Sequence, residues 1–222
     1  MTSPLWTHLV KDLRIEWRSR EAVNSMLFFA LLVVVLFSIA FDPRGAFSRE
    51  IAGGVLCVAT MFASVSALNQ AWAREIRHQV LDAQRMAPTS GAELFLAKVL
   101  ANFLFVSIVQ VILAPFFFVF YNLHIVGPAW QLALVLPLGT WALVVNGVFF
   151  AALSIGSRNR EFLLSLILFP IFIPALLAMV QAVTSILTGD GDPTLWIKML
   201  LGYDIIFTTA SLLLFDVVFH AE

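Results

Sequence analysis

Six long apolar runs, each about long enough to cross a bilayer, constrain what this chain can fold into. A helix needs about 20 residues to span the hydrocarbon core. Runs of this kind lie at residues 22–41, 51–72, 94–120, 129–155, 162–187 and 195–219. The chain is 61% hydrophobic and 12% charged, whereas soluble domains average about 45–50% apolar and about 25% charged. The sequence therefore predicts an all-α integral membrane protein with six transmembrane helices.

The connections between these runs are short, so we expect one membrane domain over residues 22–222 after an interfacial segment at residues 1–21. Lys and Arg favour the cytoplasmic side of a membrane protein. Ten of the 13 Lys and Arg residues fall in the N-terminal segment or around the connections after the second and fourth runs. Arg44, Arg49 and Lys198 fall on the other side. Both termini are therefore predicted to be cytoplasmic.

The N-terminal segment has the pattern of an amphipathic helix. Ser3 suits the N-cap and Pro4 the first helical position. Apolar residues recur at helical spacing at Trp6, Leu9, Val10, Leu13 and Trp17, and Lys11, Arg14 and Arg18 mark much of the other side. Such a helix lies along the membrane surface. It serves either as a topology anchor or as a lever joined to the first transmembrane run.

A polar stretch separates the second and third runs. Residues 74–87 predict a short surface helix with one apolar and one polar face, and Pro88 ends it. Ser90 and Glu93 have the spacing of a capping box, which opens the next helix. Residues 73–93 therefore predict a compact surface element, which is either a docking segment for another subunit or an ordinary interfacial helix.

Catalytic constellations do not stand out in the sequence. It has no G-x-x-x-x-G-K-[ST] motif, so an ATPase would have to be a separate chain. Asp204 and Asp216 are more than three helical turns apart, too far to form a catalytic dyad. His124 could touch heme, but a solvated loop histidine is the simpler interpretation. Arg44 and Arg49 could receive heme propionates, although interfacial anchoring is favoured. We expect a chain without enzymatic activity of its own.

Polar side chains within the runs have two interpretations. They can line a substrate path or a dimer seam, or they can join helices by hydrogen bonds. An acid deep in a bilayer costs roughly 3 kcal/mol on insertion scales, so Asp204 must face protein or water. The candidates are Asn102, Gln110, Asn146, Gln181 and Asp204.

Three segments carry a resemblance to a known family. They are "DLRIEWRSRE" before the first run, "LNQAWAREIRHQVLDAQRMAPTSGAELFLAKVLANF" at residues 68–103, and "LLSLILFPIFIPALL" at residues 163–177. Together with chain length and number of runs, they resemble the CcmB family of heme exporter permeases, which have the ABC-2 exporter-like architecture. The family often has an acidic residue followed by glycine where this chain has His78 and Gln79, so the chain departs from the family pattern within the proposed ATPase contact.

The resemblance implies a permease subunit in the bacterial inner membrane, with a cytoplasmic coupling helix between spans two and three. Two copies would pair with two ATPase subunits that carry ATP. A tryptophan-rich heme-handling membrane protein, a small single-span protein and a periplasmic heme chaperone would complete the complex. Heme would be the transported substrate, with no cofactor bound by this chain. The implied coupling residues are Arg74, Glu75, Arg77, His78, Asp82, Arg85, Pro88, Arg158, Arg160 and Glu161.

That assignment implies ATP-driven heme export or release of the heme-loaded chaperone during cytochrome c maturation. Two alternatives stay open. The chain could be an ABC-2 permease for another substrate, such as a lipid or a drug. It could also be a scaffold that assembles a heme-handling complex without transporting anything.

Overall fold

A computed structural model of the 222-residue chain describes residues 4–41, 46–72, 75–76, 80, 90–123, 126–155 and 160–220. Within these ranges, side chains are described except at residues 46–49, 160–165 and 218–220. The described residues form helices and their connections, without strands. The helices are α1 (Pro4–Ser19), α2 (Glu21–Ala40), α3 (Ala46–Ala71), α6 (Gly91–Phe120), α7 (Ala129–Leu153), α8 (Arg160–Thr188) and α9 (Thr194–His220).

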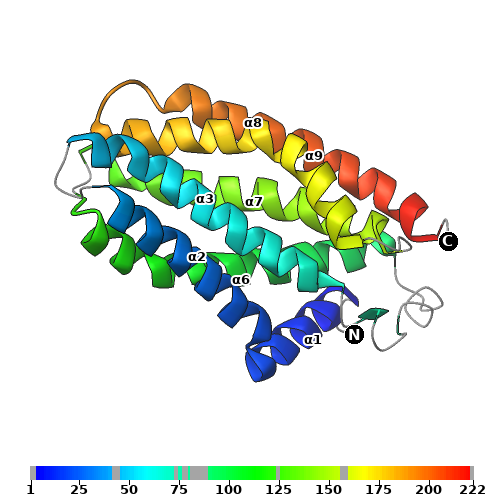
Figure 1. The fold of residues 1–222 in the computed structure, drawn as a ribbon. Helices are drawn as coiled ribbons and strands as arrows, with labels where there is room; N and C mark the ends of the chain where they lie inside the picture. The colour runs from blue at the N-terminus through cyan, green and yellow to red at the C-terminus, as the bar shows by residue number, and fades with distance from the viewer. Residues whose placement is uncertain are drawn as a thin grey trace.

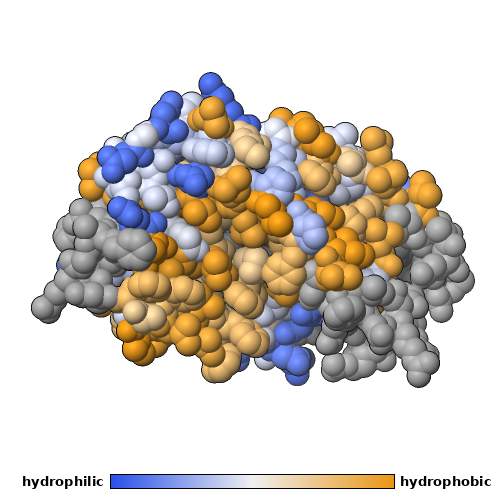
Figure 2. Space-filling model, turned by 45° about the horizontal axis from the view of Figure 1, so that its top comes forward, coloured by the Kyte–Doolittle hydropathy of each residue, from blue (hydrophilic) through white to orange (hydrophobic). Residues whose placement is uncertain are grey.

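Six of these helices are long and apolar enough to cross a membrane, which confirms the predicted fold class. The predicted runs match α2, α3, α6, α7, α8 and α9 to within a few residues. Large apolar side chains are exposed along their outer faces, including Ile39, Val111, Val119, Ile205 and Leu213. The viewed face in Figure 2 is predominantly hydrophobic, with hydrophilic residues mostly towards its margins. Such a surface suits contact with lipid tails.

The spans run side by side as an elongated bundle, and both chain termini lie at one end of it (Figure 1). The central helices are α3 and α7, where 67% and 61% of the residues in the most apolar stretch are buried. The corresponding share is 28% in α2, α6 and α9. Helix α1 lies across the end of the bundle and runs in a different direction from the spans (Figure 1).

Glycines allow the central helices to approach closely. A Cβ atom at Gly147 in α7 would collide with the side chain of Leu68 in α3, which is fully buried. A Cβ atom at Gly53 in α3 would lie 3.0 Å from the backbone nitrogen of Thr184 in α8. Small residues commonly permit such approaches between membrane helices. The bundle is therefore tightly packed along α3.

The predicted helix starts are confirmed where they are described. Helix α1 begins at Pro4. At the start of α6, the backbone nitrogen of Glu93 donates to Oγ of Ser90 at 3.3 Å, and the backbone nitrogen of Ser90 donates to Oε2 of Glu93 at 3.4 Å. This reciprocal pair is the predicted capping box, and it satisfies amide donors that would otherwise lack partners at the helix end. It fixes the point where the chain enters α6.

Helix α1 is more complex than the predicted amphipathic pattern. Leu9 is buried and Leu13 packs against the core, but Trp6 and Trp17 are 55% and 73% exposed. The side chain of Glu16 is buried, although the pattern gave it no partner. The residues facing the bundle therefore include charged side chains, because these meet opposite charges and free amides there.

Candidate functional site

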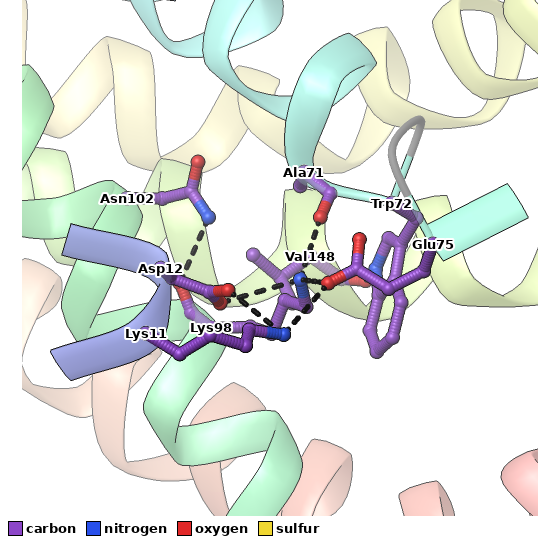
Figure 3. A network of polar contacts seen from close by, with 8 residues as sticks. All are labelled: Lys11, Asp12, Ala71, Trp72, Glu75, Lys98, Asn102 and Val148. Carbon is purple, nitrogen blue, oxygen red and sulfur yellow. Dashed lines mark hydrogen bonds and ion pairs between the residues drawn. The ribbon is translucent and has the colours of Figure 1, made fainter. Parts of the chain in front are cut away.

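Four charged side chains from three parts of the chain meet where α1 lies against α6. Asp12 contacts Nζ of Lys11 through Oδ1 at 3.1 Å and Nζ of Lys98 through Oδ2 at 3.3 Å. Oε1 of Glu75 accepts from Nζ of Lys98 at 2.5 Å and from Nζ of Lys11 at 3.2 Å. Each lysine thus contacts both carboxylates, in a closed arrangement of alternating charge that we call the ionic ring (Figure 3).

The ionic ring joins elements that are far apart in sequence. Lys11 and Asp12 come from α1, Glu75 follows the end of α3, and Lys98 lies on α6, about two turns from its start. Nζ of Lys98 also donates to the backbone carbonyl of Ala71 at 2.9 Å. Lys98 therefore holds both Ala71, the last residue of α3, and Glu75, which follows Ala71 by four residues.

Burial makes the ring energetically important. The side chains of Lys98 and Glu75 are 4% and 8% exposed. A buried charge that loses its partner is costly, typically by about 3–5 kcal/mol. Burial acts to raise the pKa of Glu75, but the ammonium groups of Lys98 and Lys11 outweigh it and hold the pKa below its ordinary value. Burial acts to lower the pKa of Lys11, but Asp12 and Glu75 raise it above its ordinary value. Both shifts favour the charged forms.

Trp72 anchors the end of α3 to the centre of the bundle. Its Nε1 donates to the backbone carbonyl of Val148 in α7 at 3.3 Å, and its ring stacks on Phe215 of α9. The ammonium group of Lys98 lies 4.9 Å from the centroid of the same ring, within the range of a cation–π contact. The chain that leaves α3 is thus attached to α6, α7 and α9 before it reaches Glu75.

A cavity of about 60 Å³, lined by both apolar and polar residues, lies beside the ring. Asp12 and Glu16 of α1 face it from one side, and Gln70, Lys98 and Asn102 contribute from α3 and α6. A water molecule needs roughly 10–15 Å³ of this kind of volume. The cavity therefore has room for a few water molecules next to the charged groups.

Most of the predicted coupling residues lie outside the described part of the chain. This applies to Arg74, Arg77, His78, Asp82, Arg85, Pro88 and Arg158. Arg160 and Glu161 form the start of α8, but their side chains are not described. Glu75 is described, and its side chain belongs to the ionic ring rather than to an exposed face. A role in ATPase coupling stays a prediction for all of them.

The predicted path or seam residues are spread over the bundle. Nδ2 of Asn102 donates to the backbone carbonyl of Lys98, and Nε2 of Gln110 to Oγ1 of Thr60 in α3. Gln181 is exposed on α8. The remaining two, Asn146 and Asp204, lie on neighbouring helices, α7 and α9. The structure therefore does not bring all five together.

Tyr203 lies at the centre of the inner polar cluster, which consists of Asn146, Tyr203 and Asp204. Its hydroxyl donates to the backbone carbonyl of Ile171 in α8 at 2.8 Å and accepts from Nδ2 of Asn146 at 3.2 Å. Asp204 is 7% exposed, and neither of its carboxylate oxygens has a hydrogen-bond partner among the described residues. This cluster links α7, α8 and α9 by neutral hydrogen bonds.

Metal binding has no evident site in the described ranges, where no group of three or more His, Cys, Asp or Glu side chains has a suitable arrangement. His8 is partly buried on α1, where burial, and then Lys11, lower its pKa. His124, the candidate heme ligand, lies outside the described residues, as does Arg44.

The ionic ring was not predicted from the sequence. Lys98 stood out only as a positive charge close to the third run, useful for orientation. The available signal was its position: a lysine inside an apolar helix must face protein or water and find an acceptor or a carboxylate. Several acids lie at the same end of the bundle, among them Asp12, Glu16, Glu75, Glu93 and Asp216. Their spacing in the sequence did not reveal which of them would meet Lys98.

Comparison with known proteins identifies the family of this chain. The sequence model of the CcmB protein family matches residues 3–219. The heme exporter protein B of Paracoccus denitrificans is 33% identical over 177 residues, which cover 79% of this chain and 80% of the relative. Proteins of the same name from Rhodobacter capsulatus and Pseudomonas aeruginosa are 33% and 31% identical. These alignments cover 76% and 82% of this chain, and 77% and 82% of the relatives. The chain therefore belongs to the CcmB protein family.

Proposed function

We propose that this chain is the membrane permease subunit of an ABC-type complex for heme trafficking in cytochrome c maturation. The observation that carries the proposal is its similarity, over most of its length, to proteins named heme exporter protein B. The six apolar helices supply the membrane-spanning body that such a role needs. ATP hydrolysis takes place on a separate subunit and drives heme export or release of a heme-loaded periplasmic chaperone.

The proposed complex contains two copies of this chain and two ATPase subunits. A tryptophan-rich heme-handling membrane protein and a small single-span protein accompany them, and the heme chaperone acts on the periplasmic side. The chain resides in the bacterial inner membrane with both termini cytoplasmic. Both termini lie at one end of the bundle, as this orientation requires (Figure 1). Heme is the substrate of the complex and not a resident group of this chain.

The proposed ATPase-docking segment is residues 73–93, with Arg158, Arg160 and Glu161 as a secondary contact. Its flanks are held firmly. On one side the ionic ring holds Glu75, and on the other the capping box fixes Ser90 at the start of α6. A segment attached at both ends can transmit a displacement caused by a bound partner to the bundle, whereas a loop without such attachments would move without displacing the helices.

Charge reversal tests this assignment. Arg77→Glu combined with Arg85→Glu is expected to abolish co-purification of the ATPase subunit from cells that express the whole gene cluster, because the polar face then repels its partner. Arg44→Glu combined with Arg49→Glu is the matched control. It reverses the same number of charges around the start of α3, at the other end of the bundle. Equal ATPase recovery with both double variants would contradict the docking assignment.

The absorption spectrum of the purified wild-type complex tests the substrate. A heme band that accompanies a tryptophan-rich partner is expected for a complex of cytochrome maturation. ATP-dependent heme flux into vesicles distinguishes transport from scaffolding: flux supports export, and its absence in a fully assembled complex supports chaperone release. A complex that contains an ATPase but neither heme nor a heme-handling partner would contradict the heme assignment.

A further inference from the structure

We propose that the ionic ring is a mechanical joint through which movement of residues 73–93 is transmitted to α1 and, through α1, to the first transmembrane helix, α2. This inference rests on the proposed function, because it takes residues 73–93 as the segment on which the ATPase acts. It assigns Lys11, Asp12, Glu75 and Lys98 as positioning residues for the coupled reaction. None of them needs to touch heme or ATP.

The first requirement of such a joint is a firm connection between α1 and α2. Oε1 of Glu16 accepts from the backbone nitrogens of Ala22 at 2.7 Å and Val23 at 3.2 Å, so a side chain of α1 caps the first turn of α2. Arg20, between the helices, has a left-handed backbone with φ of 54°. Its nitrogen donates to the carbonyl of Glu16 at 2.7 Å, and its carbonyl accepts from Asn24 at 3.0 Å. Hydrogen bonds on both sides of Arg20 therefore hold the turn between α1 and α2.

The second requirement is that the segment after α3 cannot move without α1. Glu75 contacts lysines of both α1 and α6, and Asp12 contacts the same two lysines. If Glu75 moved away alone, Lys98 would keep a single carboxylate in a site where its side chain is 4% exposed. Buried charges that lose a partner are strongly disfavoured. The favoured response to a displacement of Glu75 is therefore that α1 follows it.

The third requirement is space for a small displacement. The cavity of about 60 Å³ lies between α1 on one side and α3 and α6 on the other, and Asp12, Glu16 and Glu75 all line it. Packed helices usually shift by small steps between discrete arrangements. A cavity with room for a few water molecules between α1 and the ends of α3 and α6 gives space for such a step.

Loss of a mechanical joint should lower the yield of mature cytochrome without lowering the amount of the chain, whereas loss of a purely structural attachment should lower both. Lys11→Gln combined with Asp12→Asn removes both α1 members of the ring. It leaves the net charge unchanged and keeps the pair between Glu75 and Lys98. Arg14→Gln combined with Arg18→Gln is the control, because both arginines are exposed on the same helix. Each double variant is expressed with its whole gene cluster in cells that lack the chromosomal copy of this gene.

For the ring variant, we expect wild-type membrane levels and wild-type recovery of the ATPase subunit. The yield of mature c-type cytochrome is expected to fall by about fivefold or more, the lower range of typical coupling effects. The control is expected to keep its cytochrome yield. An unchanged yield in the ring variant would overturn the joint. So would a fall in yield that merely parallels loss of the chain or of the ATPase. Failure of the wild-type chain to recover an ATPase would overturn the proposed function itself.

A distance measurement tests the movement directly. Spin labels are introduced in the purified complex by Arg18→Cys on α1 and Leu153→Cys at the end of α7, with Cys57→Ala to remove the buried native thiol; both label positions are exposed. The distance distribution is expected to change with ATP when the ring is intact, and to stay fixed in the ring variant. A distribution that responds equally to ATP in both would overturn the proposal.

Discussion

Glu75 and Asp204 are both buried acids, yet their surroundings are opposite. Glu75 lies in the ionic ring, where one of its oxygens contacts two ammonium groups. Asp204 lies in the inner polar cluster, and its two oxygens have no hydrogen-bond partner among the described residues. The first acid holds separate elements together through charge. The second occupies a helix interface where the neutral groups of Asn146 and Tyr203 make the hydrogen bonds. Burial of an acid therefore does not by itself indicate attachment: Glu75 is held by charged partners and Glu16 by backbone amides of α2, whereas Asp204 has no hydrogen-bond partner among the described residues.

The largest effect is expected from Lys98→Ala. Asp12 and Glu75 would then share only Lys11, and Ala71 would lose its donor. Removing one partner of a buried pair costs about 3–5 kcal/mol, and the thermal unfolding temperature in detergent should fall accordingly. Lys198→Ala is the control because Lys198 is exposed on α9. Equal melting temperatures for the two variants would show that the ring does not stabilise the fold.

Substitution of the two acids, Glu75 and Asp204, is expected to change the stability by intermediate amounts and in opposite directions. Glu75→Gln leaves Lys98 and Lys11 with one carboxylate instead of two, and should destabilise by about 2 kcal/mol, as expected for a lost hydrogen bond to a charged group. Asp204→Asn removes a carboxyl group that has no partner, and should leave stability unchanged or raise it by about 1 kcal/mol, because charge at this depth is costly. Chemical denaturation of both variants checks the signs. Destabilisation by Asp204→Asn as large as that by Glu75→Gln would abolish the contrast.

The smallest effect on stability is expected from a change of pH. The lowered pKa of Glu75 means that its stabilisation is complete above the ordinary glutamate pKa of about 4.3 and is lost only as pH falls below it. The raised pKa of Lys11 preserves its contribution up to about pH 10.4. His8 has a lowered pKa, so its protonation opposes folding as pH falls below about 6.5.

Melting temperature should therefore be constant between about pH 7 and 9, within the window set by these ordinary pKa values. The first loss on acidification should disappear in a His8→Gln variant. The later loss, from the ionic ring, should remain in that variant. A ring-dependent loss that already begins near neutral pH would contradict the lowered pKa of Glu75.

Local features of the fold could be predicted from the sequence because their causes are local. Hydrophobic runs set the six spans, Pro4 sets the start of α1, and Ser90 with Glu93 sets the start of α6. In each case the determining residues are neighbours in the chain. The apolar face of α1 was only partly predictable, since Trp6 and Trp17 are exposed while charged residues face the bundle.

The ionic ring could not be predicted because it depends on tertiary contacts. Lys98 pairs with Glu75, which is 23 residues earlier, and with Asp12 on a different helix. Of the two interpretations of the polar residues within the spans, hydrogen bonding between helices describes Gln110 and Asn146, which contact Thr60 of α3 and Tyr203 of α9. Glu75 was named among the coupling residues implied by the family resemblance, and the resemblance gave no indication that its side chain lies beside Lys98 and Lys11.

The close approach of α3 to α7 limits how a large, flat molecule could cross this protein. A single added methyl group at Gly147 would already collide with Leu68. A tetrapyrrole therefore has no room between these two helices in this conformation. Passage at this level would require α3 and α7 to separate. The Gly147–Leu68 contact is therefore a point at which a larger side chain would force these two helices apart.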